Sequence, residues 1–272
     1  MKKLFLSVAL YCLQSLGYSQ ELTDTTFIAV DSVFAGRIEA AGLLPNIIGK
    51  SMMTPTAWGG YGTFIFGSIG GSFPQVYSNN PDLIASAGIG TGNSITAVSV
   101  VGILNMNDVS AINNYTLDFI VSRSISFGNS ISAGAIHLFS DPVKTDIGPS
   151  YYIAFSHASQ TLPSTISGCS KLNYTLGIGS GRFFNKSEVD VQFGRGRRGT
   201  AVFANIAYEI LPKENVGVEW TGLNLCSSLS WRPNYNLPSI CLGVADLTRF
   251  SGDKPRLIAG ISYAYLINKT VR

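Results

Sequence analysis

The sequence predicts an all-β protein, an antiparallel transmembrane β-barrel of about 12 strands with a short N-terminal segment. Three observations support this fold class. Apolar stretches of about ten residues or fewer alternate in side-chain character, as membrane-spanning strands do. Polar connections, alternately long and short, join them. Charged residues make up only 13% of the chain, against ~25% in soluble domains, and so little charge suits contact with lipid.

The first 57 residues are predicted to precede the barrel. Residues 1–19 have the features of a secretory signal peptide, because Lys2 and Lys3 precede the apolar stretch Leu4–Leu16, and Gly17–Ser19 offers a cleavage site with small residues. Residues 20–57 are polar at first and then interrupted by prolines. They are predicted to form a periplasmic or plug-like segment.

Residues 58–272 contain the predicted barrel. An even number of strands permits closure, which is required because hydrocarbon offers no water to an open strand edge. The predicted strands are Gly60–Ser68, Leu83–Gly90, Ile95–Asn105, Tyr115–Ser124, Ser130–Phe139, Tyr151–Ser159, Tyr174–Arg182, Thr200–Leu211, Val216–Thr221, Leu223–Trp231, Ile240–Leu247 and Leu257–Leu266.

The connections predict an orientation. Long connections follow odd-numbered strands and short ones follow even-numbered strands, which places both termini in the periplasm and the long loops outside the cell. Two connections depart from this pattern. Gln160–Asn173 is long where a short turn is expected, and Gly222 is a very tight link where a loop is expected. The strand count near these two places stays open.

Alternation within the strands predicts which side chains enter the lumen. In the strand Thr200–Leu211, for example, every second side chain is large and apolar, and Glu209 belongs to the opposite, inward face. The side chains predicted to line the lumen are Asp118, Asn205, Glu209, Glu219, Asn224 and Arg232. Its acids either favour cations along an aqueous path or pair with arginines such as Arg232 and hold a closed lumen together.

Three short motifs near the C-terminus resemble the closing strands of poorly characterised bacterial outer-membrane β-barrel proteins. They are Val216–Leu225 (VGVEWTGLNL), Leu237–Pro238 and Gly243–Thr248 (GVADLT). Pro55–Gly59 (PTAWG) is similar to the start of the first strand in that group. The resemblance implies a barrel located in the bacterial outer membrane, and it assigns no activity to particular residues.

An arginine cluster lies in the long connection after the seventh predicted strand. Arg195, Arg197 and Arg198 are predicted to face the exterior, where phosphates of lipopolysaccharide or acidic polysaccharide would meet them. The alternative is a solvated loop without a partner. The formal net charge of the whole chain is only +3, which does not indicate a nucleic-acid partner.

One motif raises the question of catalysis. His157-Ala158-Ser159 resembles the His-x-Ser of outer-membrane phospholipases, but Gln160 stands where that family continues with Asn-Gly. The predicted topology also places the pair near the periplasm. A lipid hydrolase is therefore a minor alternative to a protein without enzymatic activity. The histidines and cysteines do not have paired-ligand spacing, so no metal or other cofactor is predicted.

Three cysteines remain once the predicted signal peptide is removed, and an odd number argues against a disulfide framework. Cys226 and Cys241 fall in neighbouring predicted strands. They either pair in an oxidising compartment or remain small, half-buried residues.

The function predicted is that of a passive or weakly selective channel for small polar solutes. The alternative is a closed structural or surface-binding barrel that engages glycan or a partner protein through its loops. Outer-membrane lipid and lipopolysaccharide are expected neighbours, and a homo-oligomer is compatible with either function. A soluble β-sandwich is the alternative fold.

Overall fold

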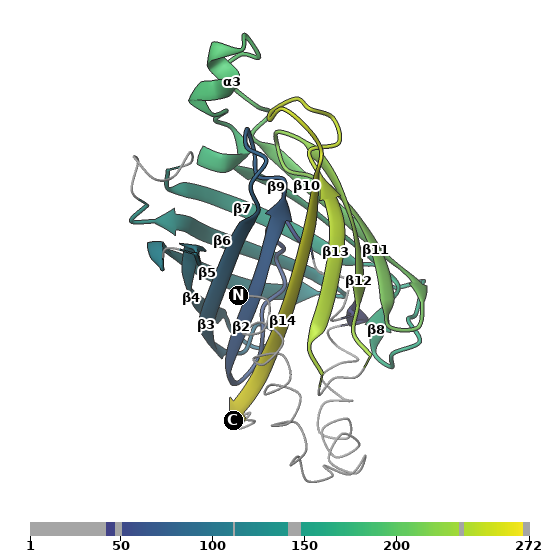
Figure 1. Cartoon of the computed structure of the whole chain (residues 1–272). Coiled ribbons are helices and arrows are strands. Elements are labelled where there is room, and N and C mark those ends of the chain that lie inside the picture. The colour runs from purple at the N-terminus through teal and green to yellow at the C-terminus, as the bar shows by residue number, and fades with distance from the viewer. Residues whose placement is uncertain (1–41, 47–50, 111, 141–147, 234–236, 269–272) are drawn as a thin grey trace. The chain divides into compact units, whose positions relative to one another are not determined.

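A computed structural model describes residues 42–46, 51–110, 112–140, 148–233 and 237–268. Twelve antiparallel strands form a closed barrel in these residues, as the sequence predicts (Figure 1). The predicted signal peptide and residues 20–41 lie outside the described part. The barrel strands are β2 (Thr63–Phe73), β3 (Asp82–Gly92), β4 (Ser99–Asp108), β5 (Asn113–Ser126), β6 (Asn129–Leu138), β7 (Ser150–Ala158), β9 (Leu172–Gly179), β10 (Val202–Leu211), β11 (Glu214–Trp220), β12 (Leu225–Trp231), β13 (Ser239–Ala245) and β14 (Arg256–Asn268).

The sheet closes between its first and last strands. Each strand pairs with the barrel strands before and after it in the chain, and β14 pairs with β2 from Leu257↔Phe73 to Asn268↔Thr63. No described barrel strand therefore keeps an unpaired edge. This is the arrangement that hydrocarbon demands, because lipid cannot hydrogen-bond a free strand edge.

The bounds of the first strand were predicted wrongly. The prediction placed this strand at Gly60–Ser68, whereas β2 spans Thr63–Phe73. A Cβ atom at Gly71 would clash with the carbonyl of Asp82 on the neighbouring strand. Glycine serves here for close approach of two strands, which is a role that local sequence does not reveal.

The two doubtful connections do not change the strand count. The connection 159–171 is long because it contains β8 (Cys169–Ser170), which pairs in parallel with β1 (Leu44–Pro45) of the N-terminal part. The link at Gly222 is a tight turn, in which Thr221 N donates to Asn224 O at 3.0 Å. Gly222 has φ +93°, in the left-handed region that favours glycine.

The barrel is apolar outside and polar inside. In β10, Val202, Ile206 and Ile210 are exposed, while Asn205 and Glu209 on the opposite face are buried. Soluble domains bury their large apolar side chains, so this inverted arrangement needs lipid around the barrel. The described residues contain no helix of the length and apolarity needed to span a membrane.

The two ends of the barrel differ. We call the end that carries the connections 74–81, 180–201 and 246–255 the loop end, and the opposite end, with the connection 212–213, the turn end. The connection 180–201 contains η2 (Gly181–Phe183) and α3 (Glu188–Gln192). Figure 1 shows α3 beyond the strand ends, near the connection between β13 and β14.

Residues 51–60, which we call the inner segment, lie in the lumen. Ala57 N donates to Ser156 Oγ on β7 at 2.9 Å, and Ala57 O accepts from Ser130 Oγ on β6 at 2.7 Å. Gly60 N donates to Ser99 Oγ on β4 at 3.2 Å. These three serines are fully buried and face inward, so the segment crosses the interior of the barrel.

Cys226 and Cys241 are too far apart to form a disulfide. The residue of β12 opposite Cys241 is Ser230, four positions after Cys226. Four residues of a strand span ~13 Å, whereas the Cα atoms of a disulfide lie within ~7 Å. Both thiols are free, as is that of Cys169.

Candidate functional site

Glu219 of β11 holds the inner segment. Its Oε1 accepts from Met52 N at 2.6 Å, and its Oε2 accepts from Met53 N at 3.0 Å and Thr54 N at 2.9 Å. The hydroxyls of Ser51 and Thr54 also donate to Oε2. The side chain is 1% exposed. The lumen acid predicted from alternation therefore accepts hydrogen bonds from the chain itself in this structure.

Glu209 of β10 also accepts several hydrogen bonds, nearer the turn end. It accepts from Asn46 Nδ2 at 2.8 Å and Thr165 Oγ1 at 2.6 Å, and the Ser164 hydroxyl also donates to it. Glu209 thus ties the described part of the N-terminal region to the long connection 159–171. None of these three contacts follows from the sequence, because the partners lie far from Glu209 along the chain.

The two predicted lumen asparagines occupy different surroundings. Asn205 Nδ2 donates to Thr54 Oγ1 of the inner segment at 3.0 Å. Asn224 Nδ2 donates to Asp246 Oδ1 at 2.9 Å, and Asn224 Oδ1 accepts from Ser251 N at 3.1 Å. Asn205 therefore faces the interior, while Asn224 holds the connection 246–255 at the loop end.

Asp118 belongs to a group that also contains two residues absent from the predicted lining. Its Oδ1 accepts from His137 N at 2.8 Å, at a bulge between β5 and β6. His137 Nε2 lies 3.4 Å from Arg182 Nη1, and Arg182 Nη2 lies 3.4 Å from Met53 O. The bulge, which turns His137 toward this group, leaves no clear mark in the sequence.

Arg232 lies at the turn end, just after β12. Its Nε donates to Leu237 O at 3.1 Å, and its backbone N donates to Lys213 O at 3.2 Å. One predicted alternative is pairing of the lumen acids with arginines such as Arg232, whereas the described hydrogen bonds of Glu209 and Glu219 come from amide and hydroxyl donors. These contacts place Arg232 at the rim beside the connection 212–213.

A cavity of about 410 Å³ lies beside the inner segment, against β2, β3, β12, β13 and β14. Its hydroxyl-bearing lining is Ser51, Ser68, Ser72, Ser86, Ser230, Ser239 and Ser262. Along β14 the lining runs from Arg256 to Ser262, which corresponds to roughly 20 Å of strand. The cavity occupies this side of the lumen, whereas the inner segment and its aromatic neighbours fill the other side.

The charged groups of this cavity lie near the loop end. Asp82 and Arg256 both line it. Arg256 Nε lies 2.6 Å from Asp246 Oδ2, and its Nη1 donates to Ser72 Oγ at 3.2 Å. The cationic group is therefore held by a carboxylate of the loop end.

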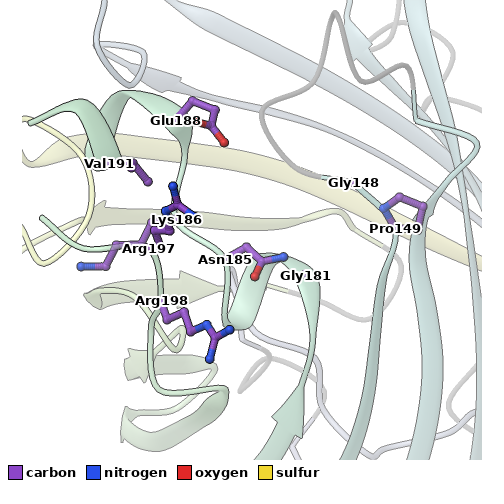
Figure 2. A pocket seen from close by; sticks show the side chains of 9 residues that line it. All are labelled: Gly148, Pro149, Gly181, Asn185, Lys186, Glu188, Val191, Arg197 and Arg198. Carbon is purple, nitrogen blue, oxygen red and sulfur yellow. The ribbon is translucent and has the colours of Figure 1, made fainter. Parts of the chain in front are cut away.

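A second pocket, of about 460 Å³, lies at the loop end (Figure 2). Arg197 and Arg198 are exposed on one stretch of chain, and Arg198 lies 5.3 Å from the centre of the Phe184 ring. Lys186 Nζ donates to Arg195 O and Phe250 O, both at 2.7 Å. The pocket is lined by Gly148, Pro149, Gly181, Asn185, Lys186, Glu188, Val191, Arg197 and Arg198.

Arg195 has a different environment from the other two arginines. Its Nη1 lies 2.8 Å from Oδ1 of the buried Asp190, and its guanidinium also donates to Gly252 O. Burial by itself would raise the pKa of Asp190, but hydrogen bonds from Ser251, Tyr77 and Arg195 outweigh it and lower the pKa. Arg195 and Asp190 thus join the connection 180–201 to the connection 246–255.

The residues of the predicted His-x-Ser motif lie near the turn end. His157 shares the outward face of β7 with exposed Phe155. His157 Nδ1 lies 2.7 Å from Asn129 Oδ1, and Ser159 Oγ lies 3.2 Å from Thr161 Oγ1. The structure therefore brings His157 to Asn129. In the described part of the chain, no three His, Cys, Asp or Glu side chains are grouped so that they could hold a metal ion.

Comparison with known proteins gives likenesses in structure alone. No protein-family model and no curated protein sequence matches the chain. A KdgM porin in complex with disordered oligogalacturonate is 11% identical, with a TM-score of 0.43 over 74% of this chain and 99% of the porin. The chain is an outer-membrane β-barrel. Its closed sheet and its apolar outer face place this barrel in the bacterial outer membrane.

Two further solved structures are similar to this outer-membrane barrel. Outer membrane phospholipase A from Escherichia coli is 8% identical, with a TM-score of 0.41 over 80% of this chain and all of that one (100%). A mutant of the Rh. blastica porin is 10% identical, with a TM-score of 0.33 over 75% of this chain and 99% of the porin.

Proposed function

We propose that this outer-membrane barrel is a passive or weakly selective channel for small polar solutes. The observation that carries the proposal is the cavity of about 410 Å³ beside the inner segment. Seven serines and three glycines are among its 21 lining residues, so hydroxyls are available to a hydrated solute and small side chains leave space for it. Transport selectivity in such a passage depends on its width and on the donors and acceptors along it.

The filled side of the lumen limits the size of the solute. Tyr152, Phe183 and Phe203 pack against one another there, with centroid distances of 4.5–6.2 Å between their rings. Ala57 of the inner segment packs into the same cluster. Because this side is occupied by a packed core, a solute has only the serine-lined side available, which favours small molecules.

Conductance of the purified full chain in planar bilayers tests this function. We expect small, discrete steps in KCl solution, because ions pass through any continuous water-filled lumen. Heat-modifiable gel mobility verifies that the same preparation contains folded barrel. Folded protein that gives no conductance steps and no solute flux contradicts the channel.

The loop-end pocket supports a second function, the binding of acidic groups at the surface. Arg197 and Arg198 are exposed beside the pocket, and guanidinium groups bind phosphate and carboxylate with two hydrogen bonds. We propose phosphates of lipopolysaccharide or an acidic glycan as ligands. Arg195 contributes indirectly to this proposed site, because its side chain is bound to Asp190.

A further inference from the structure

We infer that the cavity selects uncharged, polyhydroxylated solutes such as small sugars and sugar alcohols. This inference rests on the proposed channel function, since it assigns the solute class of the same cavity. Three features carry it: a row of serines in register, charges that are already paired, and apolar patches between the hydroxyls.

Four serines form a row across four adjacent strands. The β-sheet register places Ser86 opposite Ser68, Ser68 opposite Ser262, and Ser262 opposite Ser239. All four line the cavity. Successive strands lie about 4.8 Å apart, so the row presents regularly spaced hydroxyls, each of which can donate and accept.

The side-chain amide of Asn105 on β4 continues the serine row, and several hydroxyls of the row already form hydrogen bonds within the protein. Ser86 Oγ donates to Asn105 Oδ1 of β4 at 2.7 Å, and the hydroxyls of Ser239 and Ser262 lie 2.8 Å apart. Hydroxyls bonded to one another exchange readily for hydroxyls of a solute, because donors and acceptors are replaced in kind. A sugar or polyol satisfies this requirement along its whole length.

The charges of the cavity offer little to an anion. Arg256 is bound to Asp246 at 2.6 Å and to the Ser72 hydroxyl. Asp82 lines the same region and adds a negative charge. A carboxylate solute would therefore lose water at a place where the arginine already has a carboxylate partner, and such uncompensated desolvation is unfavourable.

Apolar surface lies between the hydroxyls. Gly70 and Gly260 face each other in the register and remove side-chain bulk from the middle of the cavity. Met52, Ile84 and Ile258 line it as well. Sugars have hydroxyl rims and apolar C–H faces, so they match walls of this mixed character better than an ion does.

Flux into proteoliposomes that contain the full chain tests the inference. Glucose and sorbitol are compared with gluconate, which has similar size and carries a negative charge. We expect the uncharged solutes to enter at least roughly tenfold faster, because an unpaired charge costs more to desolvate than an unpaired neutral polar group. Gluconate entry at the rate of glucose would overturn the inference.

A double variant tests the serine row itself. Ser68→Ala with Ser262→Ala removes two hydroxyls without narrowing the cavity, and we expect it to lower the ratio of glucose to gluconate flux by about threefold or more. Ser227→Ala is the matched control, because Ser227 lies on the outward face of β12, opposite the exposed Val218. A ratio unchanged in the double variant contradicts the role of the row.

The outcomes separate this inference from the channel itself. Ion conductance without a preference for uncharged solutes would contradict the solute class and leave the channel standing. Loss of both conductance and flux in folded wild-type protein would overturn both.

Discussion

Thr54 is bound twice to Glu219: its backbone N and its Oγ1 lie 2.9 and 3.0 Å from Oε2. With the amides of Met52 and Met53, the inner segment forms a nest of N–H groups around one buried carboxylate. This contact fixes the segment to the wall of the barrel. Residues 51–53 of the same segment also line the cavity of about 410 Å³.

Replacing Glu219 by glutamine is expected to loosen the inner segment. The glutamine side chain has one acceptor oxygen and places an NH2 group against N–H donors. Each hydrogen bond to a charged group contributes about 1.5–3 kcal/mol to stability, so part of that contribution is lost. We expect faster hydrogen exchange of the amides of residues 51–57 and larger conductance. Glu214→Gln, in the same strand at the turn end, is the control. Unchanged hydrogen exchange in Glu219→Gln would show that Glu219 does not hold the inner segment.

The reactivity of Cys169 tests whether Glu209 holds the connection 159–171, which contains this cysteine. Burial, and then the charge of Glu209, raise the pKa of Cys169 to about 11, so its reactive thiolate is scarce at neutral pH. Glu209→Gln removes the charge and replaces one of the two oxygens that accept from Ser164 and Thr165 by an NH2 group. Labelling by a thiol reagent should accelerate about tenfold for every unit by which the pKa falls.

Peptide mass mapping follows Cys169 separately from the other thiols in this experiment. Cys226, which is 2% exposed, is the internal reference for general unfolding. Equal labelling of Cys169 in Glu209→Gln and wild type would show that Glu209 does not hold the connection 159–171.

Asp190 is expected to keep the loop end closed over a wide pH range. Its pKa is lowered in the folded protein, since hydrogen bonds from Ser251, Tyr77 and Arg195 outweigh the opposing effect of burial. Stability from the ionised carboxylate is therefore fully present above the unfolded value of ~3.9 and is lost as pH falls through the lower folded value. Hydrogen exchange in residues 246–255 should stay slow at pH 5 and rise only below about pH 4.

The variant Asp190→Asn is expected to open the same loops at neutral pH. The loss is about 1–3 kcal/mol, reduced by screening because the Arg195 side chain is 30% exposed. Glu188→Gln, on the exposed side of α3, is the control. Equal exchange in Asp190→Asn and wild type at pH 7 would refute this role.

The arginines of the loop end are expected to separate into two classes. Arg197→Gln with Arg198→Gln should weaken binding to lipopolysaccharide in a salt-dependent manner, with loop protection unchanged, because both side chains are exposed. Arg195→Gln should instead loosen the loops, since it removes the partner of Asp190. Lipopolysaccharide binding that is insensitive to the double variant would exclude the surface site.

A lipid-hydrolysis assay tests the His-x-Ser motif. We expect purified wild-type barrel and Ser159→Ala to give the same background rate, because Ser159 Oγ lies beside Thr161 and His157 beside Asn129. A nucleophilic serine needs hydrogen-bond contact with its histidine. Hydrolysis by the wild type that disappears in Ser159→Ala would establish the enzyme instead.

Much of the fold could be predicted because the signals are local. A strand places successive side chains on opposite faces, so alternation in Thr200–Leu211 was enough to send Glu209 inward and Ile206 outward. The predicted first strand ended at Ser68, whereas β2 continues to Phe73 through Gly71, where the neighbouring strand approaches too closely for a side chain. The alternation of side chains along one strand does not reveal which residues of neighbouring strands come into contact.

The sequence alone predicted a closed barrel of about 12 strands and, in strands with clear alternation, the inward direction of Glu209 and Glu219. Only the tertiary structure decided what those acids meet, because Thr54 and Glu219 are separated by 165 residues and come together through closure of the sheet. The serine row likewise depends on register, since shifting Ser68 by one position against Ser262 would place one of them on the lipid face. The same holds for Arg195, whose partner Asp190 becomes buried only when the loops pack together.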